Sequence, residues 1–461
     1  MTDNIPIFKR KLYNRLLQWK HEENGRTALL IEGARRVGKS TLAEEFGKNE
    51  YESYILIDFS KASKKINDLF EDISDLNSLF MQLQFEYHVS LTPRRSLIIF
   101  DEVQFNPKAR QAIKHLVADG RYDYIETGSL ISISRNIKNI LIPSEEEQIK
   151  MYPMDFEEFL WAIGDTATPD LLRQAIKMGV ALGGAHRTLM RTFRLYLLVG
   201  GMPQAVAEYI ATNDLLRVDK MKRGIINLYL ADLKKIDESG RISRIFEAVP
   251  GQLNRKLSRY MLQPVIGDID EKKEDSMISE LAASMTVNMC YHTSDPANGL
   301  AMDYNKDYFK IYIGDTGLFV TLAFWDRDVV ENEIYNKLLS DKLSANLGYV
   351  YENVVAQILV SGGRKLFYYT FPTENKHLYE IDFLIAVDSK ISPIEVKSSG
   401  YKTHKSLDDF IRKYSSKTKD PLIVYTKDYH KEGTIRYLPV YMLPFYIEKR
   451  DNKDHKKERL I

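Results

Sequence analysis

Eight residues near the N-terminus constrain the fold of this chain more than any other feature: Gly33-Ala34-Arg35-Arg36-Val37-Gly38-Lys39-Ser40. They fill every fixed position of the Gly-x-x-x-x-Gly-Lys-Ser/Thr pattern, the P-loop. The glycines let backbone amides converge on phosphate oxygens, and the helix that follows presents its positive N-terminus to the same anion. A strand-length apolar run, Ala28–Ile31, precedes the loop, and a helical stretch, Lys39–Phe46, follows it. This context predicts a nucleotide site in a parallel α/β sheet.

Residues of this loop have separate expected roles. Lys39 is expected to reach the β- and γ-phosphates of ATP, and the Ser40 hydroxyl to take a place on Mg²⁺. The set predicted to bind the nucleotide comprises Gly33, Ala34, Arg35, Arg36, Val37, Gly38, Lys39, Ser40 and Thr41.

Two acids end a second apolar strand, where Leu97–Phe100 is followed by Asp101 and Glu102. Asp101 is placed to hold the Mg²⁺ shell, as a Walker B aspartate does, and Glu102 to polarise the attacking water. Capping of a helix is the alternative role of such a pair. Beside this P-loop the nucleotide role is favoured.

A third element, Ile125–Ser129, ends the next strand-like run. Thr127 and Ser129 are candidates to sense the γ-phosphate, and a plain Thr-Gly-Ser turn is the alternative.

Alternation of strands and helices over the first third predicts a parallel sheet with helices on both faces. The chain of 461 residues has room for two to four domains. We expect an α/β domain with a helical subdomain over 1–212, and a helical, winged-helix-like domain over 213–330. An α/β domain with a charged tail is expected over 331–461.

The N-terminal motifs resemble the AAA-type ATPase domain of a widespread prokaryotic family that is usually described only as ATP-binding. Pro153–Leu160 and Gly200–Pro203 resemble two further segments of that family. The resemblance implies ATP hydrolysis with ATP and Mg²⁺. An oligomer is compatible with it, because AAA-type domains often place an arginine finger across a subunit interface. One departure is that Ser144–Gln148 stands where the family usually carries a Gly-Arg pair; Arg135 is either its replacement or a surface arginine.

A group of acids follows in the last third. Asp382 lies within one predicted strand, and Glu395 and Lys397 lie two apart on the next, so both point to the same face. If the strands form a hairpin, Asp382 lies near Glu395 and makes a hard-oxygen site for Mg²⁺ or Mn²⁺. Such a metal lowers the pKa of a bound water, while a lysine orients the nucleophile for phosphodiester hydrolysis.

This arrangement resembles the PD-(D/E)XK nuclease superfamily, which has a restriction-endonuclease-like fold. The resemblance places Asp382, Glu395 and Lys397 on the catalytic motif, and it makes Glu352, which opens a helix, a third metal-binding acid. Two alternatives remain: a solvated edge strand with alternating charge, and an inactive nuclease fold that only binds.

Nucleic acid is a candidate partner, DNA more than RNA. Lys and Arg total 65 and Asp and Glu 64, so such binding needs a local basic face. A helix predicted over 241–260 would offer one, and the alternative is a solvated helix paired with acids at 268–275. Its basic residues are Arg241, Arg244, Arg255, Lys256 and Arg259.

The single cysteine, Cys290, excludes an intramolecular disulfide and fits a reducing compartment. Because no stretch approaches the about 20 apolar residues that span a bilayer, we expect a cytoplasmic protein without a membrane partner.

Two hypotheses follow. In the first, an AAA-type ATPase repositions a nuclease-like domain on nucleic acid. In the second, the chain is a nucleotide-dependent switch or scaffold whose nuclease-like fold recognises a partner.

Overall fold

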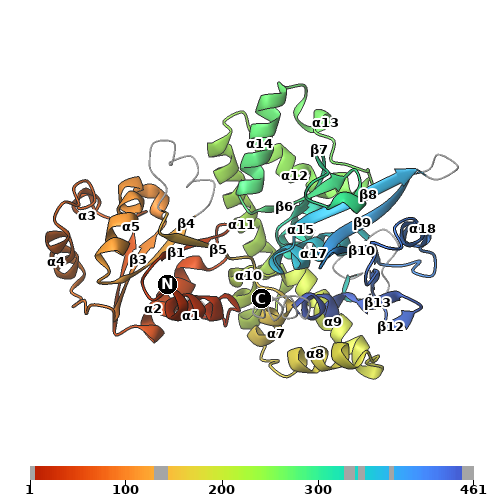
Figure 1. Cartoon of the computed structure of the whole chain (residues 1–461), viewed down its shortest axis with the longest axis horizontal. Helices are drawn as coiled ribbons and strands as arrows, with labels where there is room; N and C mark the ends of the chain where they lie inside the picture. The colour runs from red at the N-terminus through yellow and green to blue at the C-terminus, as the bar shows by residue number, and fades with distance from the viewer. Residues whose placement is uncertain (1–5, 129–143, 327–337, 341–347, 373–377, 449–461) are drawn as a thin grey trace. The chain divides into compact units, whose positions relative to one another are not determined.

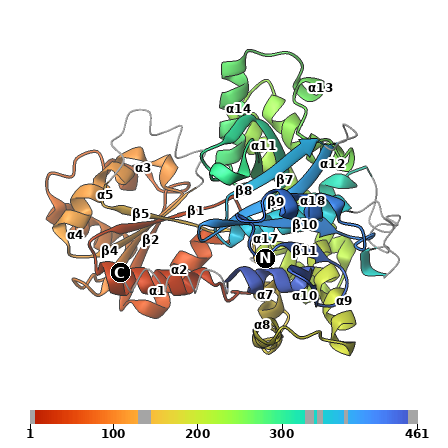
Figure 2. The ribbon, with the colours of Figure 1, turned by 45° about the vertical axis from the view of Figure 1, so that its right-hand side comes forward.

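The computed structural model describes residues 6–128, 144–326, 338–340, 348–372 and 378–448 (Figures 1 and 2). The chain divides into two compact units. Unit one is Met1–Tyr152 with Ala283–Met285, and unit two is Pro153–Ala282 with Thr286–Ile461. The boundary expected between 212 and 213 falls inside unit two, and the one between 330 and 331 lies outside the described residues. A further division of unit two stays a prediction.

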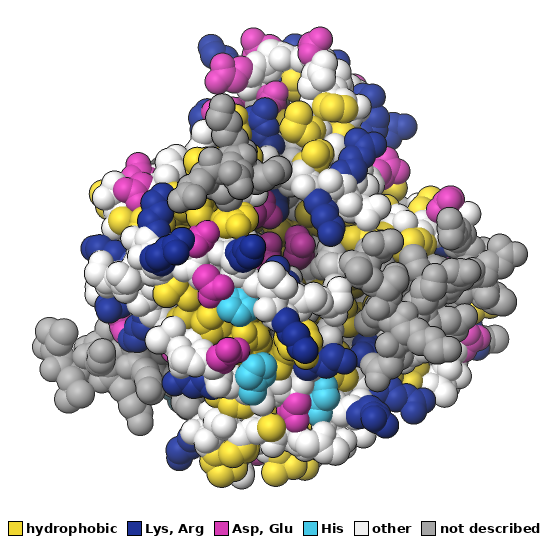
Figure 3. Space-filling model, turned by 90° about the vertical axis from the view of Figure 1, so that its right-hand side faces the viewer, with side chains coloured by type: hydrophobic (Ala, Val, Ile, Leu, Met, Phe, Trp, Pro, Cys, Tyr) yellow, Lys and Arg dark blue, Asp and Glu magenta, His cyan; other side chains and the backbone are white. Residues whose placement is uncertain are grey.

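Charges of both signs are interspersed on the face drawn in Figure 3, where apolar side chains lie between them. Within the described ranges, no helix has both the length and the apolar character needed to cross a membrane.

Unit one is built on a five-stranded sheet in the order β2-β3-β4-β1-β5, with every pair parallel. This confirms the expected parallel sheet, and β5, formed by the acidic segment that replaces the Gly-Arg pair, is a strand that was not expected. The elements are α1 (Leu12–Glu23), β1 (Ala28–Glu32), α2 (Lys39–Glu50), β2 (Ser53–Asp58), α3 (Lys64–Asp68), α4 (Leu76–Tyr87), β3 (Ser96–Asp101), the short 3-10 helix η1 (Val103–Phe105), α5 (Pro107–Asp119), β4 (Asp123–Gly128) and β5 (Glu146–Lys150).

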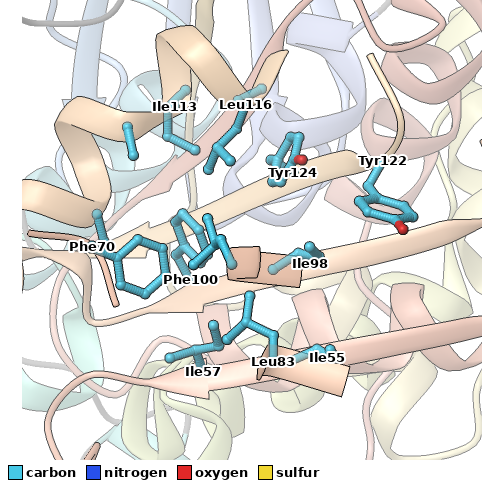
Figure 4. Packing of buried hydrophobic residues seen from close by; sticks show 14 of the residues in the cluster. Ile55, Ile57, Phe70, Leu83, Ile98, Phe100, Ile113, Leu116, Tyr122 and Tyr124 are labelled. Atoms are coloured by element: carbon cyan, nitrogen blue, oxygen red, sulfur yellow. The ribbon is translucent and has the colours of Figure 1, made fainter. Parts of the chain in front are cut away.

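The core of unit one lies between this sheet and α3, α4 and α5 (Figure 4). Ile113 and Leu116 of α5 pack over Phe100 of β3 and Tyr124 of β4. Successive side chains of a strand point to opposite faces, and these two point to the face that α5 covers. On the other side, Gly47 of α2 lies against Ile99. Both faces are therefore covered, which explains why the strands are apolar along their whole length.

Unit two begins with helices. They are α7 (Phe156–Ala162), α8 (Thr168–Met178), α9 (Gly184–Val199), α10 (Pro203–Thr212), α11 (Leu215–Ile236), α12 (Arg241–Asn254), α13 (Gln263–Ile266) and α14 (Glu271–Ala283). One expectation was wrong. The helix predicted over 241–260 ends at Asn254, because Lys256 adopts a left-handed backbone with φ of 53°.

An eight-stranded mixed sheet forms the rest of unit two, in the order β12-β13-β11-β10-β9-β8-β6-β7. Two of its strands, β6 and β7, come from the segment expected to be mostly helical, and β6 pairs in parallel with β8 (Figure 1). The elements are β6 (Val287–Thr293), the 3-10 helix η3 (Pro296–Asn298), β7 (Tyr304–Ile313), α15 (Thr316–Ala323), α17 (Gly348–Ser361), β8 (Leu366–Pro372), β9 (Leu378–Val387), β10 (Lys390–Lys397), α18 (Lys405–Lys413), β11 (Leu422–Tyr425), β12 (His430–Glu432), β13 (Ile435–Pro439) and the 3-10 helix η6 (Val440–Met442).

Candidate nucleotide site and carboxylate centre

The P-loop connects β1 to α2, and its two glycines are needed for different reasons. A Cβ at Gly33 would lie 2.4 Å from the carbonyl oxygen of Met151, so only glycine allows this close approach. Gly38 has φ of 100°, a backbone conformation that residues with a side chain rarely adopt. It precedes the first residue of α2, so the loop ends at the helix N-terminus, as the sequence predicted.

Lys39 is buried, and its Nζ donates hydrogen bonds to the carbonyl oxygens of Gly33 (3.0 Å) and Ala34 (3.1 Å). Burial lowers the pKa of Lys39, while Glu102 and Asp101 act in the opposite direction. The ammonium group therefore lies inside the loop, as expected for a phosphate-binding lysine. Arg35, Arg36 and Thr41 are exposed, whereas Ala34 and Val37 are buried.

Three predicted residues meet at the carboxyl ends of β3 and β4. Ser40 Oγ donates to Asp101 Oδ1 at 2.6 Å, and Thr127 Oγ1 donates to the same oxygen. The backbone N–H of Glu102 donates to Thr127 Oγ1 at 3.3 Å. The remaining candidates, Ser129 and Arg135, lie outside the described residues.

Glu102 has a left-handed backbone with φ of 52°, which is uncommon outside glycine and asparagine. Its Oε2 accepts a hydrogen bond from Gln104 Nε2, a partner that the sequence reasoning did not single out.

The residues around Asp101 fit a nucleotide with Mg²⁺. A serine hydroxyl and a carboxylate oxygen at hydrogen-bond distance form the kind of hard-oxygen pair that Mg²⁺ prefers. Lys39 adds a positive charge beside them, where nucleotide phosphates would need it.

Arg10 supports the loop and was missed from the sequence. Its guanidinium is buried and donates to the carbonyl oxygens of Val37 (2.8 Å) and Tyr152 (2.6 Å). It therefore links the loop to the end of unit one. Arg10 lies in the basic run Lys9-Arg10-Lys11. Such a run is equally typical of a solvated terminus, so the sequence did not indicate this role.

The acidic segment before Pro153 has a structural role. Glu146 of β5 lies 3.1 Å from Arg110, and Arg110 lies 3.6 Å from the fully buried Glu126 of β4. Burial, followed by a hydrogen bond with Glu146, raises the pKa of Glu126 well above its usual range. The carboxyl groups of Glu126 and Glu146 thus form a cluster around Arg110 in the sheet.

In unit two, β9 and β10 pair antiparallel up to Phe383 and Ile394. Asp382, the next residue outward on β9, accepts a hydrogen bond from the backbone N–H of Val396 at its Oδ2 (2.7 Å). This brings Asp382 beside the segment that carries Glu395 and Lys397, as the expected hairpin requires.

Glu395 is 2% exposed, and its Oε2 has no hydrogen-bond partner. Lys397 Nζ lies 3.4 Å from this oxygen, which agrees with the expectation that both side chains share one face. Burial raises the pKa of Glu395 to about 7; Lys397 opposes this shift and Asp382 adds to it.

Glu352 of α17 has different neighbours. Burial and then Asp382 raise the pKa of Glu352 to about 7, and Lys310 of β7 opposes them. Lys310 itself forms an ion pair with Glu380 of β9 at 2.5 Å. Sequence reasoning missed Lys310 and Glu380. Glu380 could have been found, since it precedes Asp382 by two residues on one strand, but no local pattern connects Lys310 to this site.

The acids of unit two do not form the expected trio of ligands. Among the side chains that the structure describes, no three or more His, Cys, Asp and Glu residues are arranged to hold a metal ion. Glu352 interacts electrostatically with Lys310 and Glu380 as well as with Asp382. The buried Oε2 of Glu395 has no hydrogen bond, only the ion pair with Lys397, and with Asp382 it would offer two carboxylates to one divalent ion.

The predicted basic residues are split between α12 and the loop after it. Arg259 lies 4.2 Å from the ring of Tyr308, and the exposed Lys256 acts electrostatically on Glu352. Lys256 therefore lies near Glu352, whereas Arg259 packs on an aromatic ring.

Three family models match parts of the chain. Residues 25–160 match a family described as an AAA domain. Residues 190–329 and 347–443 match two families described as domains of unknown function, DUF8612 and DUF4143. No curated protein matches the chain.

Among solved structures, the Orc1 protein of Aeropyrum pernix in complex with DNA is 12% identical, covers 72% of this chain and 96% of its own, and has a TM-score of 0.27. Cdc6p of Pyrobaculum aerophilum is 11% identical, covers 75% and 98%, and has a TM-score of 0.28. PCH-2 of C. elegans is 11% identical, covers 46% and 66%, and has a TM-score of 0.26. The family match and the P-loop geometry together identify the N-terminal part of the chain as an AAA-type P-loop domain.

Proposed function

We propose that this chain hydrolyses ATP at the P-loop of unit one. The observation that carries the proposal is the 2.6 Å contact between Ser40 Oγ and Asp101 Oδ1, because it joins the phosphate loop to the acid that would share its Mg²⁺. Lys39 binds the β- and γ-phosphates, and Glu102 orients and polarises the attacking water. Thr127, bonded to Asp101, reports the state of the γ-phosphate.

The test compares Lys39→Ala and Glu102→Gln in full-length protein, measuring nucleotide affinity and phosphate release separately. We expect Lys39→Ala to lose binding. Glu102→Gln should keep binding but lose about 100-fold or more in turnover, because only the polarising group is removed. Lys48→Ala is the matched control, since Lys48 is partly exposed at the other end of α2. Unchanged turnover in Glu102→Gln would contradict the role of this residue.

A second candidate function is phosphodiester hydrolysis by unit two. It is favoured by the buried Oε2 of Glu395, which has no hydrogen bond and lies 3.4 Å from Lys397 Nζ. Asp382 and Glu395 would hold Mg²⁺, which supplies an acidified water at such a site. Lys397 holds the nucleophile in line, and nucleic acid, DNA before RNA, is the substrate. The nearby Lys256 and Arg259 would contact its phosphates.

Labelled single- and double-stranded DNA and RNA, with Mg²⁺ and with or without ATP, test this function. We expect Asp382→Asn to abolish cleavage and leave ATP hydrolysis intact, and Lys39→Ala to remove any effect of ATP on cleavage. Asp388→Asn is the matched control, because Asp388 is an exposed residue in the turn that connects β9 to β10. The wild type could also cleave nothing and fail to bind nucleic acid at every salt concentration tested. That result would contradict the nuclease and favour a nucleotide-dependent switch that recognises a protein partner.

A further inference from the structure

Two cations lie among the carboxylates of unit two. Glu395 forms an ion pair with Lys397, whereas Glu380 forms one with Lys310, which also interacts electrostatically with Glu352 and Asp382. Lys397 is partly exposed, but the Lys310 side chain is only 7% exposed. A charge buried this deeply is retained only where opposite charges compensate it.

Lys310 is fixed from several sides. It sits on β7, opposite the buried Cys290 of β6, and its Nζ lies 5.2 Å from the ring centre of Tyr368. Its Nζ also lies 2.5 Å from Glu380 Oε1, and it interacts electrostatically with Glu352 and Asp382. The ammonium group is thus confined among acids, as a bound cation would be.

We propose that Lys310 takes the place of a second divalent ion: it is the built-in counter-ion of Glu352 and Glu380, so the centre accepts one divalent ion, at Asp382 and Glu395. This inference rests on the metal site proposed above. Two-metal sites need acidic ligands around both ions, which lie about 3.5–4 Å apart. The ammonium already neutralises one of the two acid groups, and its charge repels any ion that approaches there.

Counting bound Mn²⁺ by electron paramagnetic resonance, without nucleotide, tests the proposal on full-length protein. The wild type should bind one ion more than Asp382→Asn. Lys310→Met should bind one ion more than the wild type, since Glu352 and Glu380 lose their counter-ion. Lys306→Met is the matched control: Lys306 is on the same strand, exposed, and paired with Asp275, so its loss should leave the count unchanged.

The outcomes separate this inference from the proposed function. An equal count in Lys310→Met and the wild type overturns the role of Lys310 and leaves the site at Asp382 in place. Equal counts in the wild type and Asp382→Asn, with an added ion in Lys310→Met, overturn the proposed metal site and support Lys310 as a substitute cation.

Thermal melting provides the second measurement, because Lys310→Met leaves buried acids without their counter-ion and so destabilises the fold. We expect millimolar Mn²⁺ to restore its folding, because the ion replaces the missing charge. A variant that stays unfolded in Mn²⁺ overturns the proposal. Lys310→Arg keeps the charge and should match the wild type in both measurements.

Discussion

Lys222 of α11 lies in the interior of unit two, and its ammonium group donates to the carbonyl oxygens of Leu198 (2.6 Å) and Gly317 (3.3 Å). Burial lowers the pKa of Lys222 to about 8, against the opposing effects of Asp219 and Asp315 and with a smaller contribution from Arg223. Asp315 accepts a hydrogen bond from the backbone N–H of Gly201 at 2.6 Å. One lysine thus connects the C-terminal end of α9 with the start of α15.

This depressed pKa predicts how stability changes with pH. Between pH 8 and the ordinary value of 10.5, the unfolded chain binds more protons at Lys222 than the folded chain, so stability rises with pH. Over this whole pH range the free energy of unfolding should rise by about 3 kcal/mol because of Lys222. The free energy of unfolding of the wild type and of Lys222→Met is measured with urea across this pH range. Their difference isolates Lys222, because the other titratable groups contribute equally to both proteins. A difference that stays flat, or that falls with pH, would contradict the assignment.

At the scale of elements, the turn between α9 and α10 depends on a close backbone approach. A Cβ at Gly201 would lie 2.1 Å from the carbonyl oxygen of Met154, which accepts a hydrogen bond from Tyr196. Met154 N–H in turn donates to the carbonyl oxygen of Gly201 at 2.7 Å. The two motifs that resembled a known family, around Pro153 and Gly200, are therefore in direct contact within unit two.

Gly201→Ala should lower the free energy of unfolding by about 3 kcal/mol or more, because backbone atoms must move to admit the methyl group. Gly224→Ala is the matched control: this glycine is inside α11, and a Cβ there meets nothing within 4 Å. It should stabilise the protein by about 0.5–1 kcal/mol, through the better helix propensity of alanine. If urea unfolding shows the same change in the free energy of unfolding for both variants, this explanation is wrong.

At the scale of the whole molecule, unit two depends on segments that are distant in sequence. Asn353 of α17 bonds both backbone groups of Ile313 at the end of β7, at 2.8 Å and 3.1 Å, and Gln357 bonds Thr316. Together with the pairing of β6 with β8, these contacts join the regions matched by two separate family models.

Truncation after Ser340 should therefore leave unit two unfolded, because β6 loses its partner strand β8 and β7 loses the buried side chain of Asn353. The hydrogen bond between Gln357 and Thr316 is lost as well. We expect calorimetry to lose the unit-two transition and limited proteolysis to degrade residues after Tyr152, while unit one keeps its own transition. Truncation after Glu448 is the control and should leave both transitions unchanged. A stable fragment 153–340 would show instead that the middle segment folds by itself.

The sequence alone determined the P-loop, the parallel sheet that carries it, and the shared face of Glu395 and Lys397. Each of these depends on local spacing: turn chemistry, strand period, or a helix that directly follows a loop. The same local information placed the end of α12 too late, because the left-handed backbone of a single residue such as Lys256 leaves only a weak signal in the sequence.

Only the tertiary structure decided which buried charges meet. Arg10 reaches Val37 across 27 residues, and Lys310 reaches Glu380 across 70. The placement of β6 and β7 in the C-terminal sheet is of the same kind. Strand pairing at long range sets these contacts, and the free energy of burying a charge then selects its partner, so neither follows from the pattern of neighbouring residues.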